Sequence, residues 1–327
     1  MTRAHIIGTG SYAPEKVLTN DDLAKLVETS DAWIVERTGI KQRHVAAPDE
    51  AASDLALKAA IRALEMAATR PEEIDLIIVG TISADLPMPA AAAFLAHKLG
   101  ATKAFAFDLS AACAGSLFGM SVASQYIQTG AIRRALVVGV EVLTRIVDWE
   151  DRNSCVLFGD AAGALVLGPS PDENRGILST HLHTDGSQTD ILCIRGGGSK
   201  TPFSEEVLKQ KLHKVSMNGR EVFKFAVRAL TEAVKEALSH NGVTADSVAH
   251  VIAHQANIRI IDAVLERLSI PRSKAWLNID RYGNTSSASL PITLDEAVRA
   301  GRLKEGDLIA MMAIGAGMSW GSGMLRW

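Results

Sequence analysis

One cysteine of the chain stands where it could act as a nucleophile. Cys113 follows an apolar run over residues 104–109 and precedes a segment of helical spacing that ends near Gly130. It therefore lies where a predicted strand passes into a predicted helix. The free N–H groups of a helix start carry partial positive charge, which favours the thiolate over the thiol. The alternative is a buried and inert residue, because free cysteines usually pack as small apolar side chains.

A histidine and an asparagine in the second half offer hydrogen-bonding groups of the kind that acyl transfer needs. His254 lies between a predicted strand over 248–253 and a predicted helix over 258–268. Open α/β sheets bind ligands at this end of their strands. Asn284 lies in a polar loop before another predicted helix. Each has a structural alternative, a hydrogen-bonded core histidine and a member of an ordinary helix-capping loop.

A glycine-rich turn at residues 314–318 completes the set, because glycines let backbone N–H groups approach a ligand closely. A cysteine, two neutral hydrogen-bonding groups and backbone donors for an oxyanion suffice for acyl transfer through a thioester. Papain-like cysteine proteases carry Cys, His and Asn in the same order, so a thiol hydrolase remains an alternative. The chain lacks the Cys-Gly-Ser/Ala-Cys-Trp/Tyr signature of those proteases.

Alternating helices and strands must position these residues. The first half predicts such elements at residues 54–66, 74–79, 90–99, 104–109, 114–128 and 135–140. The second half repeats the order at residues 223–238, 248–253, 258–268, 291–299 and 308–314. Segment 73–79 resembles 247–253, and segment 130–139 resembles 304–312. We therefore expect an α/β protein of two related halves, with the cysteine in residues 1–172 and the histidine and asparagine in 173–327.

Composition limits the partners and the location. The 327 residues are 47% hydrophobic and carry a formal net charge of -3, so no basic field attracts nucleic acid or an anionic membrane. The cysteines, Cys113, Cys155 and Cys193, lack disulfide-framework spacing, which favours reduced thiols and a cytoplasmic location. Residues 308–325 predict strand, turn and strand rather than a membrane helix. We expect no metal site.

Several separated motifs resemble the beta-ketoacyl-acyl-carrier-protein synthase III family. They are Leu109-Ser-Ala-Ala-Cys113-Ala-Gly, His254-Gln-Ala-Asn257, Gly283-Asn284-Thr285-Ser286 and the C-terminal Gly-Ala-Gly-Met-Ser-Trp-Gly. The segment from Ser30 to Ile40 resembles the family as well, and the likeness runs from Ile6 to Trp327. It implies a thiolase-like fold, in which two similar α/β halves pack as αβαβα layers, and a homodimer.

The resemblance implies that the protein initiates fatty-acid synthesis. A short acyl-CoA would condense with malonyl-acyl-carrier protein, with release of CoA and carbon dioxide. Cys113 would carry the acyl group, and His254 and Asn284 would hold the malonyl thioester carbonyl. The backbone N–H groups of Cys113 and Ala316 would form the oxyanion hole. A neutral imidazole that donates through one ring nitrogen suits the enolate oxygen. Acyl-CoA enters as substrate, and no cofactor is implied.

The resemblance also implies contacts with CoA and with the acidic carrier protein. The residues at the CoA positions are Trp33, Arg37, Thr38, Arg152 and Asn257. Arg259 matches a carrier-docking position, and Met88 stands where the family often has Phe, at the floor of the partner subunit's acyl pocket. Arg220 and Ala316 also depart from the family pattern, which has Asn and Gly at these places.

Related functions carry similar residues. A specialised type III-like ketosynthase or acyltransferase of a polyketide or other secondary-metabolite pathway would share the motifs. A non-catalytic scaffold would be expected to lose Cys113, His254 or Asn284, and all three are present. Thiolase chemistry is disfavoured because no cysteine follows Cys193. Elongating synthases use two histidines, so Asn284 argues against them.

Overall fold

Two five-stranded sheets form the frame of the protein, whose computed structural model describes residues 2–327. The first sheet has the spatial order β1 (Ala4–Tyr12), β7 (Ala161–Pro169), β6 (Ala135–Glu141), β4 (Leu76–Gly80) and β5 (Phe105–Leu109). The second has the order β8 (Gly176–Thr184), β14 (Ser319–Arg326), β13 (Leu308–Gly315), β11 (His250–Ala253) and β12 (Ala275–Trp276). In each sheet the first two strand pairs are antiparallel and the last two are parallel.

The two halves therefore repeat one topology. β4 occupies the place in the first sheet that β11 occupies in the second, and β6 corresponds to β13 in the same way. These strands are the ones whose sequences resemble each other. The prediction of an α/β fold with two similar halves is confirmed. Residue 172, where the sequence analysis ends the first half, lies between the end of β7 at Pro169 and the start of β8 at Gly176.

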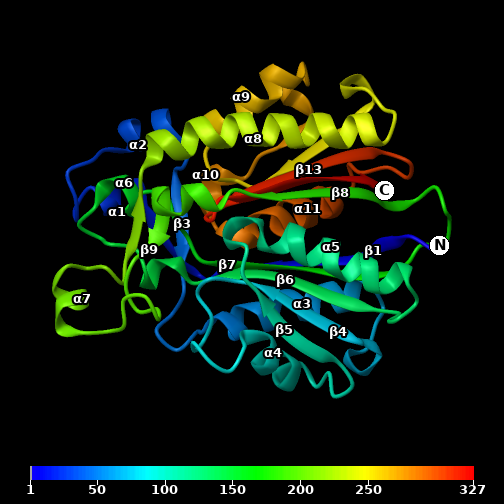
Figure 1. Ribbon diagram of the computed structural model, residues 1–327, viewed down its shortest axis with the longest axis horizontal. Coiled ribbons are helices and arrows are strands. Elements are labelled where there is room, and N and C mark those ends of the chain that lie inside the picture. The colour runs from blue at the N-terminus through cyan, green and yellow to red at the C-terminus, as the bar shows by residue number, and fades with distance from the viewer. Residues whose placement is uncertain (1) are drawn as a thin grey trace.

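Helices and sheets alternate in five layers (Figure 1). The outer face of the first sheet is covered by α3 (Ala52–Met66) and α4 (Ala91–Leu99). The outer face of the second is covered by α8 (Gly219–His240) and α9 (Ile258–Leu268). The middle layer contains α5 (Gly115–Gln128) and α11 (Ser289–Arg299). This is the αβαβα order that the sequence resemblance implies.

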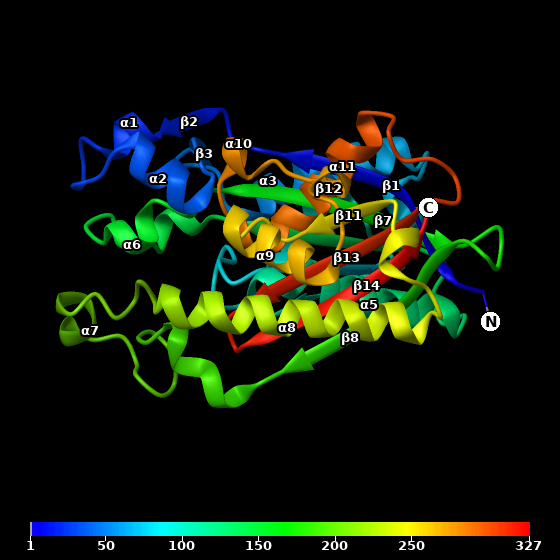
Figure 2. The same ribbon diagram turned by 90° about the horizontal axis from the view of Figure 1, so that it is seen from above.

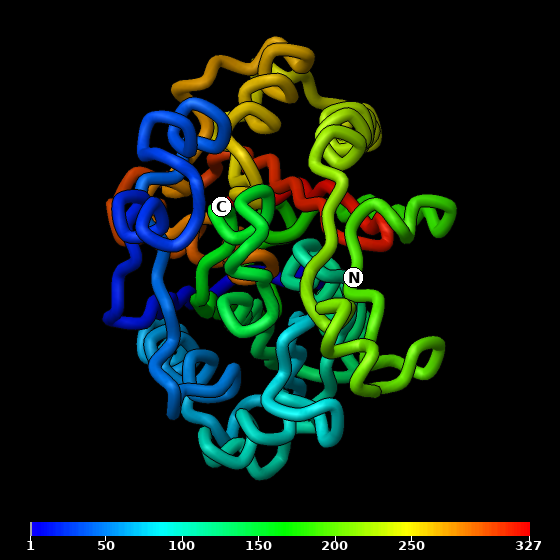
Figure 3. Tube along the Cα trace, turned by 90° about the vertical axis from the view of Figure 1, so that its left-hand side faces the viewer, coloured from blue at the N-terminus to red at the C-terminus, as the bar shows by residue number. Residues whose placement is uncertain are grey.

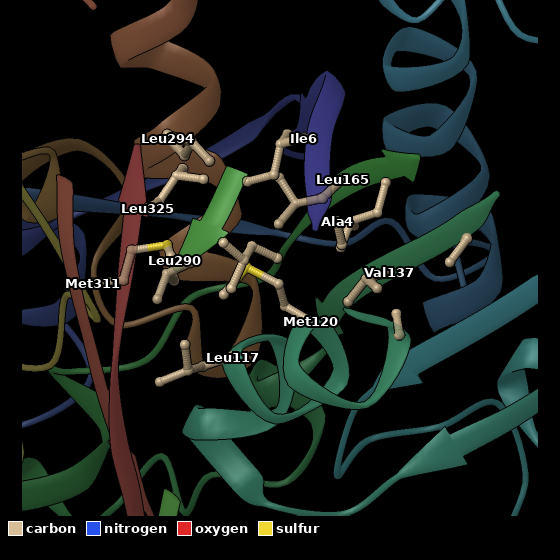
Figure 4. Packing of buried hydrophobic residues seen from close by; sticks show 14 of the residues in the cluster. Ala4, Ile6, Leu117, Met120, Val137, Leu165, Leu290, Leu294, Met311 and Leu325 are labelled. Carbon is tan, nitrogen blue, oxygen red and sulfur yellow. The ribbon is translucent and has the colours of Figure 1, made fainter. Parts of the chain in front are cut away.

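The middle layer is packed with apolar side chains from both sheets and both helices (Figure 4). They include Ile6, Leu117, Met120, Leu165, Leu290, Leu294, Met311 and Leu325. Gly119 lets α5 approach the first sheet, because a Cβ there would lie only 3.1 Å from the nearest sheet atom. Burying each large side chain contributes about 1.5–3 kcal/mol. This packing fixes the starts of α5 and α11, where the candidate chemistry lies.

Short elements outside the repeat cover one end of the layers, and the chain ends lie toward the other end (Figure 2). Figure 3 looks onto the covered end. The short elements are β2 (Lys16–Thr19), α1 (Asn20–Leu23), α2 (Asp31–Thr38), β3 (Gln42–Val45), α6 (Arg152–Cys155), β9 (Leu192–Ile194), α7 (Glu205–Lys209), β10 (Val215–Met217) and α10 (Ile279–Tyr282). Within residues 2–327, no helix is long and apolar enough to cross a membrane.

Candidate active site

Cys113 lies on a short 3-10 turn, Ala112–Ala114, that leads from β5 into α5. The predicted junction of strand and helix is therefore present. The turn of residues 315–317 packs against the cysteine from the second half. A Cβ on Gly315 would lie 2.4 Å from the backbone N of Cys113 and 2.8 Å from Ala111 O, so a side chain does not fit there. This close approach brings Ala316 to the wall of the same cavity as Cys113.

The electrostatic expectation for Cys113 is wrong. Its side chain is buried, and burial raises the pKa of the thiol to about 12. The nearby charge of Glu141 raises this pKa further, whereas a hydrogen bond with the Ser286 hydroxyl lowers it. Loss of solvent around a charged sulfur is the largest cause of this shift. The raised pKa favours the thiol at rest, and a thiol needs a proton acceptor before it can attack.

Glu141 lies at the end of β6, fully buried beneath this turn. One carboxylate oxygen accepts hydrogen bonds from Ser83 Oγ (2.6 Å), Ile82 N (3.1 Å) and Thr81 Oγ1 (3.2 Å). The other accepts from Ser286 Oγ at 2.9 Å and from Ser287 Oγ at 3.3 Å. Burial raises the pKa of Glu141 to about 7, although these donors oppose the shift. Its protonation therefore changes near neutral pH.

His254 directly follows β11, and its backbone N donates to Met312 O at 2.8 Å. The ring is buried, with Nδ1 2.5 Å from Ser289 Oγ. Burial lowers the pKa of His254 to about 3, so the imidazole is neutral at ordinary pH. Because Nδ1 is engaged by Ser289, Nε2 is the ring nitrogen left for a substrate.

Asn284 is held from both sides by backbone hydrogen bonds. Its N donates to Leu157 O at 2.8 Å, and its carbonyl accepts from Gly159 N at 3.0 Å. The side-chain oxygen accepts from Ser286 N at 2.8 Å, which leaves the Nδ2 amide group as the free donor. Within residues 2–327 no group accepts a hydrogen bond from that Nδ2.

Cys113, His254 and Asn284 line one cavity of about 120 Å³, so the structure brings the three together. Beyond Cys113 lies a second, almost entirely apolar cavity of about 250 Å³. Its walls include Ile82, Leu143, Phe158, Leu192, Cys193, Ile194 and Val215. The thiol therefore stands where the passage that holds His254 and Asn284 meets an apolar chamber.

A wider cavity of about 860 Å³ forms the mouth of the passage. Trp33, Arg37, Thr38, Asn257 and Arg259 line it, as do Arg220 and Lys224. No carboxylate lines this mouth among the described residues, so its lining is cationic, although Glu221 and Glu36 pair with Lys224 and Arg37. Such a surface favours polyanions.

The residues that are predicted to bind CoA make different contacts within the protein. Arg37 and Arg152 lie 4.5 and 5.1 Å from the ring centroid of Trp33. Arg152 does not line the mouth, and its Nη1 donates to Glu28 O at 2.9 Å. The Thr38 hydroxyl donates to Ile34 O at 2.7 Å within α2. Asn257 caps α9, because its Oδ1 accepts from Arg259 N at 2.9 Å.

Met88 lies outside the walls of the mouth, the passage and the chamber. It is 82% exposed, in the segment between β4 and α4, and other exposed apolar side chains lie nearby. His181 and His183 both contact the Glu236 carboxylate. Within residues 2–327, no group of three or more His, Cys, Asp or Glu side chains could hold a metal ion.

The sequence analysis assigns no role to four residues that matter for the site: Arg43, Glu141, Ser286 and Ser289. Arg43 is fully buried and donates to Val156 O (2.7 Å) and Asn20 Oδ1 (2.9 Å). It thereby supports the segment that pairs with Asn284. The available signal for Glu141 was one acidic residue at the end of an otherwise apolar run. The serines looked like ordinary residues of a polar loop.

Fold and site together define an acyltransferase of the thiolase-like condensing class. Family models narrow the class: 3-Oxoacyl-[acyl-carrier-protein (ACP)] synthase III matches residues 107–186, and the C-terminal model of that family matches residues 238–327. The chain belongs to the beta-ketoacyl-[acyl-carrier-protein] synthase III family.

Individual relatives agree with this assignment. Proteins named beta-ketoacyl-[acyl-carrier-protein] synthase III are 50% identical in Desulfitobacterium hafniense, covering 100% of this chain and 98% of the relative, and 52% identical in Symbiobacterium thermophilum, covering 98% and 97%. The crystal structure of 3-oxoacyl-[acyl-carrier-protein] synthase III from Aquifex aeolicus has a TM-score of 0.93 at 45% identity, covering 99% of this chain and 100% of that one. A priming beta-ketosynthase from the R1128 polyketide pathway has a TM-score of 0.92 at 35% identity, covering 99% and 96%.

Proposed function

We propose that the protein condenses a short acyl-CoA with malonyl-acyl-carrier protein to give a 3-oxoacyl-carrier protein, CoA and carbon dioxide. This reaction starts fatty-acid synthesis. The observation that carries the proposal is the position of Cys113 between an apolar chamber of about 250 Å³ and a passage lined by His254 and Asn284. The chamber suits the acyl chain, and the passage suits the second thioester.

In the first half-reaction Cys113 attacks the acyl-CoA carbonyl. The oxyanion that forms needs donors that are not already used. Within the described residues, neither Cys113 N nor Ala316 N donates a hydrogen bond to another group. Gly315 holds these two N–H groups near each other. We assign them the oxyanion hole, and we assign the chamber beyond Cys113 to the acyl chain.

In the second half-reaction malonyl-carrier protein loses carbon dioxide, and the resulting enolate attacks the acyl-cysteine. No base is needed to remove a carbon-bound proton. Asn284 Nδ2 and His254 Nε2 donate to the enolate oxygen. The Ser289 hydroxyl lies within reach of both Ser286 O (2.9 Å) and His254 Nδ1 (2.5 Å). When it turns to donate to Nδ1, the proton of the neutral ring is on Nε2.

The cationic mouth receives the CoA nucleotide and then the acidic carrier protein. Adenine stacks on Trp33, flanked by Arg152, and the phosphates meet Arg37 beside Thr38. Asn257 contacts the pantetheine arm at the entrance of the passage. Arg259 docks the carrier protein. The support is the common place of all of these residues except Arg152 around one cavity without a carboxylate in its wall. Arg152 is included because its guanidinium, like that of Arg37, lies over Trp33. The reaction uses acyl-CoA as substrate and no resident cofactor.

The working unit is a homodimer. Leu86, Met88 and Phe105 expose large apolar surface around the edge strand β5, which is the kind of surface that a partner covers. Met88 then reaches the floor of the partner's acyl chamber. A cytoplasmic location fits the three free cysteines.

The test is the intact mass of the protein after incubation with a panel of short and medium acyl-CoAs, followed by malonyl-carrier protein. Wild type and Cys193→Ala should gain one acyl mass, whereas Cys113→Ala should not. Cys193 is the matched control because it lines the same chamber. Discharge as a 3-oxoacyl product supports condensation. Discharge by water alone would mean a hydrolase, and absence of loading would mean a carrier-bound donor or a scaffold.

The R1128 priming ketosynthase keeps one further function open, the priming of a polyketide pathway. The same experiment separates the two functions when fatty-acid and polyketide carrier proteins are offered in parallel. Preference for the former by tenfold or more supports fatty-acid initiation.

A further inference from the structure

Glu141 is a buried carboxylate for which the condensation reaction has no use. It is fully buried, and no lysine or arginine among residues 2–327 forms an ion pair with it. Three donors from residues 81–83 satisfy one of its oxygens, and the hydroxyls of Ser286 and Ser287 satisfy the other. An uncompensated buried carboxylate is costly, so its place beside the nucleophile calls for a function.

Ser286 stands between this carboxylate and the nucleophile. Its hydroxyl donates to Glu141 Oε1 at 2.9 Å, and the same hydroxyl lowers the pKa of the Cys113 thiol. Ser286 and Cys113 line the same cavity wall. A hydroxyl both accepts and donates, so it can receive a proton from the thiol while it passes its own to the carboxylate.

We propose that Ser286 and Glu141 form a two-step relay that takes the thiol proton of Cys113 and stores it while the enzyme is acylated. The proton moves from Cys113 Sγ to Ser286 Oγ, and the original hydroxyl proton moves to Glu141 Oε1. This proposal deepens the proposed function, on which its role in the full cycle rests.

The bonds and protons of the relay balance over the two half-reactions. During acylation the bond from Cys113 Sγ to the acyl carbon forms, and the bond to the CoA sulfur breaks. CoA leaves as a thiolate and takes a proton from solvent at the cationic mouth. During condensation the Cys113 thiolate is released, and the proton stored on Glu141 returns through Ser286. One proton is consumed per turnover, which matches the loss of a carboxylate as carbon dioxide.

The surroundings favour this assignment over simple structural support. Apart from Cys113, the groups around Glu141 are uncharged: Thr81, Ile82 and Ser83 after β4, and Ser286 and Ser287 on the turn before α11. His254 lies on the other side of that turn, against Ser289. The raised pKa of Glu141, about 7, allows the carboxyl to gain and lose a proton under working conditions.

The test is the rate at which iodoacetamide alkylates Cys113 between pH 5 and 9, followed by intact mass. In wild type we expect the rate to rise through an inflection near pH 7, because only the carboxylate form of Glu141 accepts the proton. Glu141→Gln and Ser286→Ala should lose this inflection, with a rate at pH 8 at least tenfold lower. Ser286→Ala is included because replacing a fully buried acid can prevent folding.

Ser287→Ala is the matched control. Its hydroxyl is also buried and makes its short hydrogen bond to Gly80 O at 2.6 Å, with a longer one to Glu141 Oε1 at 3.3 Å, but it does not line the cavity wall that holds Cys113 and Ser286. It should keep the inflection. An inflection near pH 7 that persists in Ser286→Ala, with only a uniformly lower rate, would overturn the relay. An inflection that disappears in His254→Ala but stays in Glu141→Gln would overturn it as well.

A second readout is infrared difference spectroscopy on acylation by acyl-CoA. Wild type should gain a carboxylic-acid carbonyl band that is missing in Glu141→Gln. Alkylation requires neither acyl-CoA nor carrier protein, so failure of the proposed function and failure of the relay give different results. A wild type with the pH 7 inflection but no acyl loading retains the relay chemistry without the synthase.

Discussion

The hydroxyl of Ser289 lies 2.5 Å from Nδ1 of His254. Ser289 is the first residue of α11, in the middle layer, and His254 follows the buried strand β11. The same hydroxyl contacts Ser286 O at 2.9 Å and Gln255 N at 3.2 Å. These contacts fix the ring orientation, so that only Nε2 is left to meet a substrate.

Replacing Ser289 by Ala should slow condensation while acyl loading remains normal. One hydrogen bond contributes about 0.5–1.5 kcal/mol, so carbon dioxide release from malonyl-carrier protein should fall about 3- to 10-fold. Rapid-quench mass spectrometry of loading, beside carbon dioxide release, separates the two steps. Ser322→Ala is the control, because its equally buried hydroxyl donates to Ala233 O away from the site. Equal losses in both half-reactions would contradict this role.

The buried, neutral His254 should make the fold sensitive to acid. Its folded pKa of about 3 lies below the ordinary value of 6.5, so between these values the unfolded chain binds more protons. Stability is therefore lost as the pH falls from 6.5 towards 3, at about 1.4 kcal/mol per unit. In urea unfolding, His254→Asn should remove this slope relative to wild type. His97→Asn, at an exposed position, should retain it.

Glu141 changes the pH dependence of the free energy of unfolding in the opposite direction to His254. The contribution of His254 is therefore measured as the difference between wild type and the variant. The folded pKa of Glu141, about 7, lies above the ordinary value of 4.5. The stabilisation of the folded state by Glu141 is therefore complete below pH 4.5 and is lost as the pH rises to 7. The two groups offset each other between pH 4.5 and 6.5, so the wild-type curve alone would hide both. An unchanged slope in His254→Asn would contradict the assignment to this histidine.

Sequence patterns were sufficient for the frame, since period and local signals determine it. They gave Cys113, His254 and Asn284 only as candidates, and the roles of these residues came from the family resemblance. The junction at Cys113 and the matching strands β4 and β11 are visible in short windows. The pKa of Cys113 was not predictable, because burial and the charge of Glu141 arise only when layers pack. Ser286 and Glu141 are 145 residues apart, and nothing local indicates that they meet.

Arg43 should be required for stability although it touches no proposed substrate group. It is fully buried, and Arg43→Met would leave Val156 O and Asn20 Oδ1 without their donor. Each buried unpaired group costs about 1–3 kcal/mol, so we expect a loss of about 2–4 kcal/mol in urea unfolding. Arg62→Met is the control, since Arg62 is exposed and donates to a single carbonyl, Ser11 O. It should cost less than about 1 kcal/mol.

The same Arg43 substitution should also weaken condensation in whatever protein stays folded. Val156 precedes Leu157, whose carbonyl accepts from Asn284 N at 2.8 Å. A shift of this segment moves the Asn284 amide. Carbon dioxide release, measured well below the unfolding midpoint, should fall more than acyl loading does. Full activity in a destabilised Arg43→Met would show that the segment keeps its position without the guanidinium.

Different residues of the mouth should determine KM for the two substrates, acyl-CoA and malonyl-carrier protein. Stacking of a base on an aromatic ring is worth about 1–3 kcal/mol, so Trp33→Ala should raise KM for acyl-CoA about tenfold or more with little change in kcat.

Arg259→Ala should instead raise KM for malonyl-carrier protein a few fold, because an exposed ion pair contributes only about 0.2–1 kcal/mol. This second effect should shrink as salt screens the charges. Arg267→Ala, two turns further along α9 and equally exposed, is the matched control and should change neither constant. If Arg259→Ala and Arg267→Ala act alike, the carrier protein responds to net charge rather than to a docking residue, and Arg259 loses its assigned role.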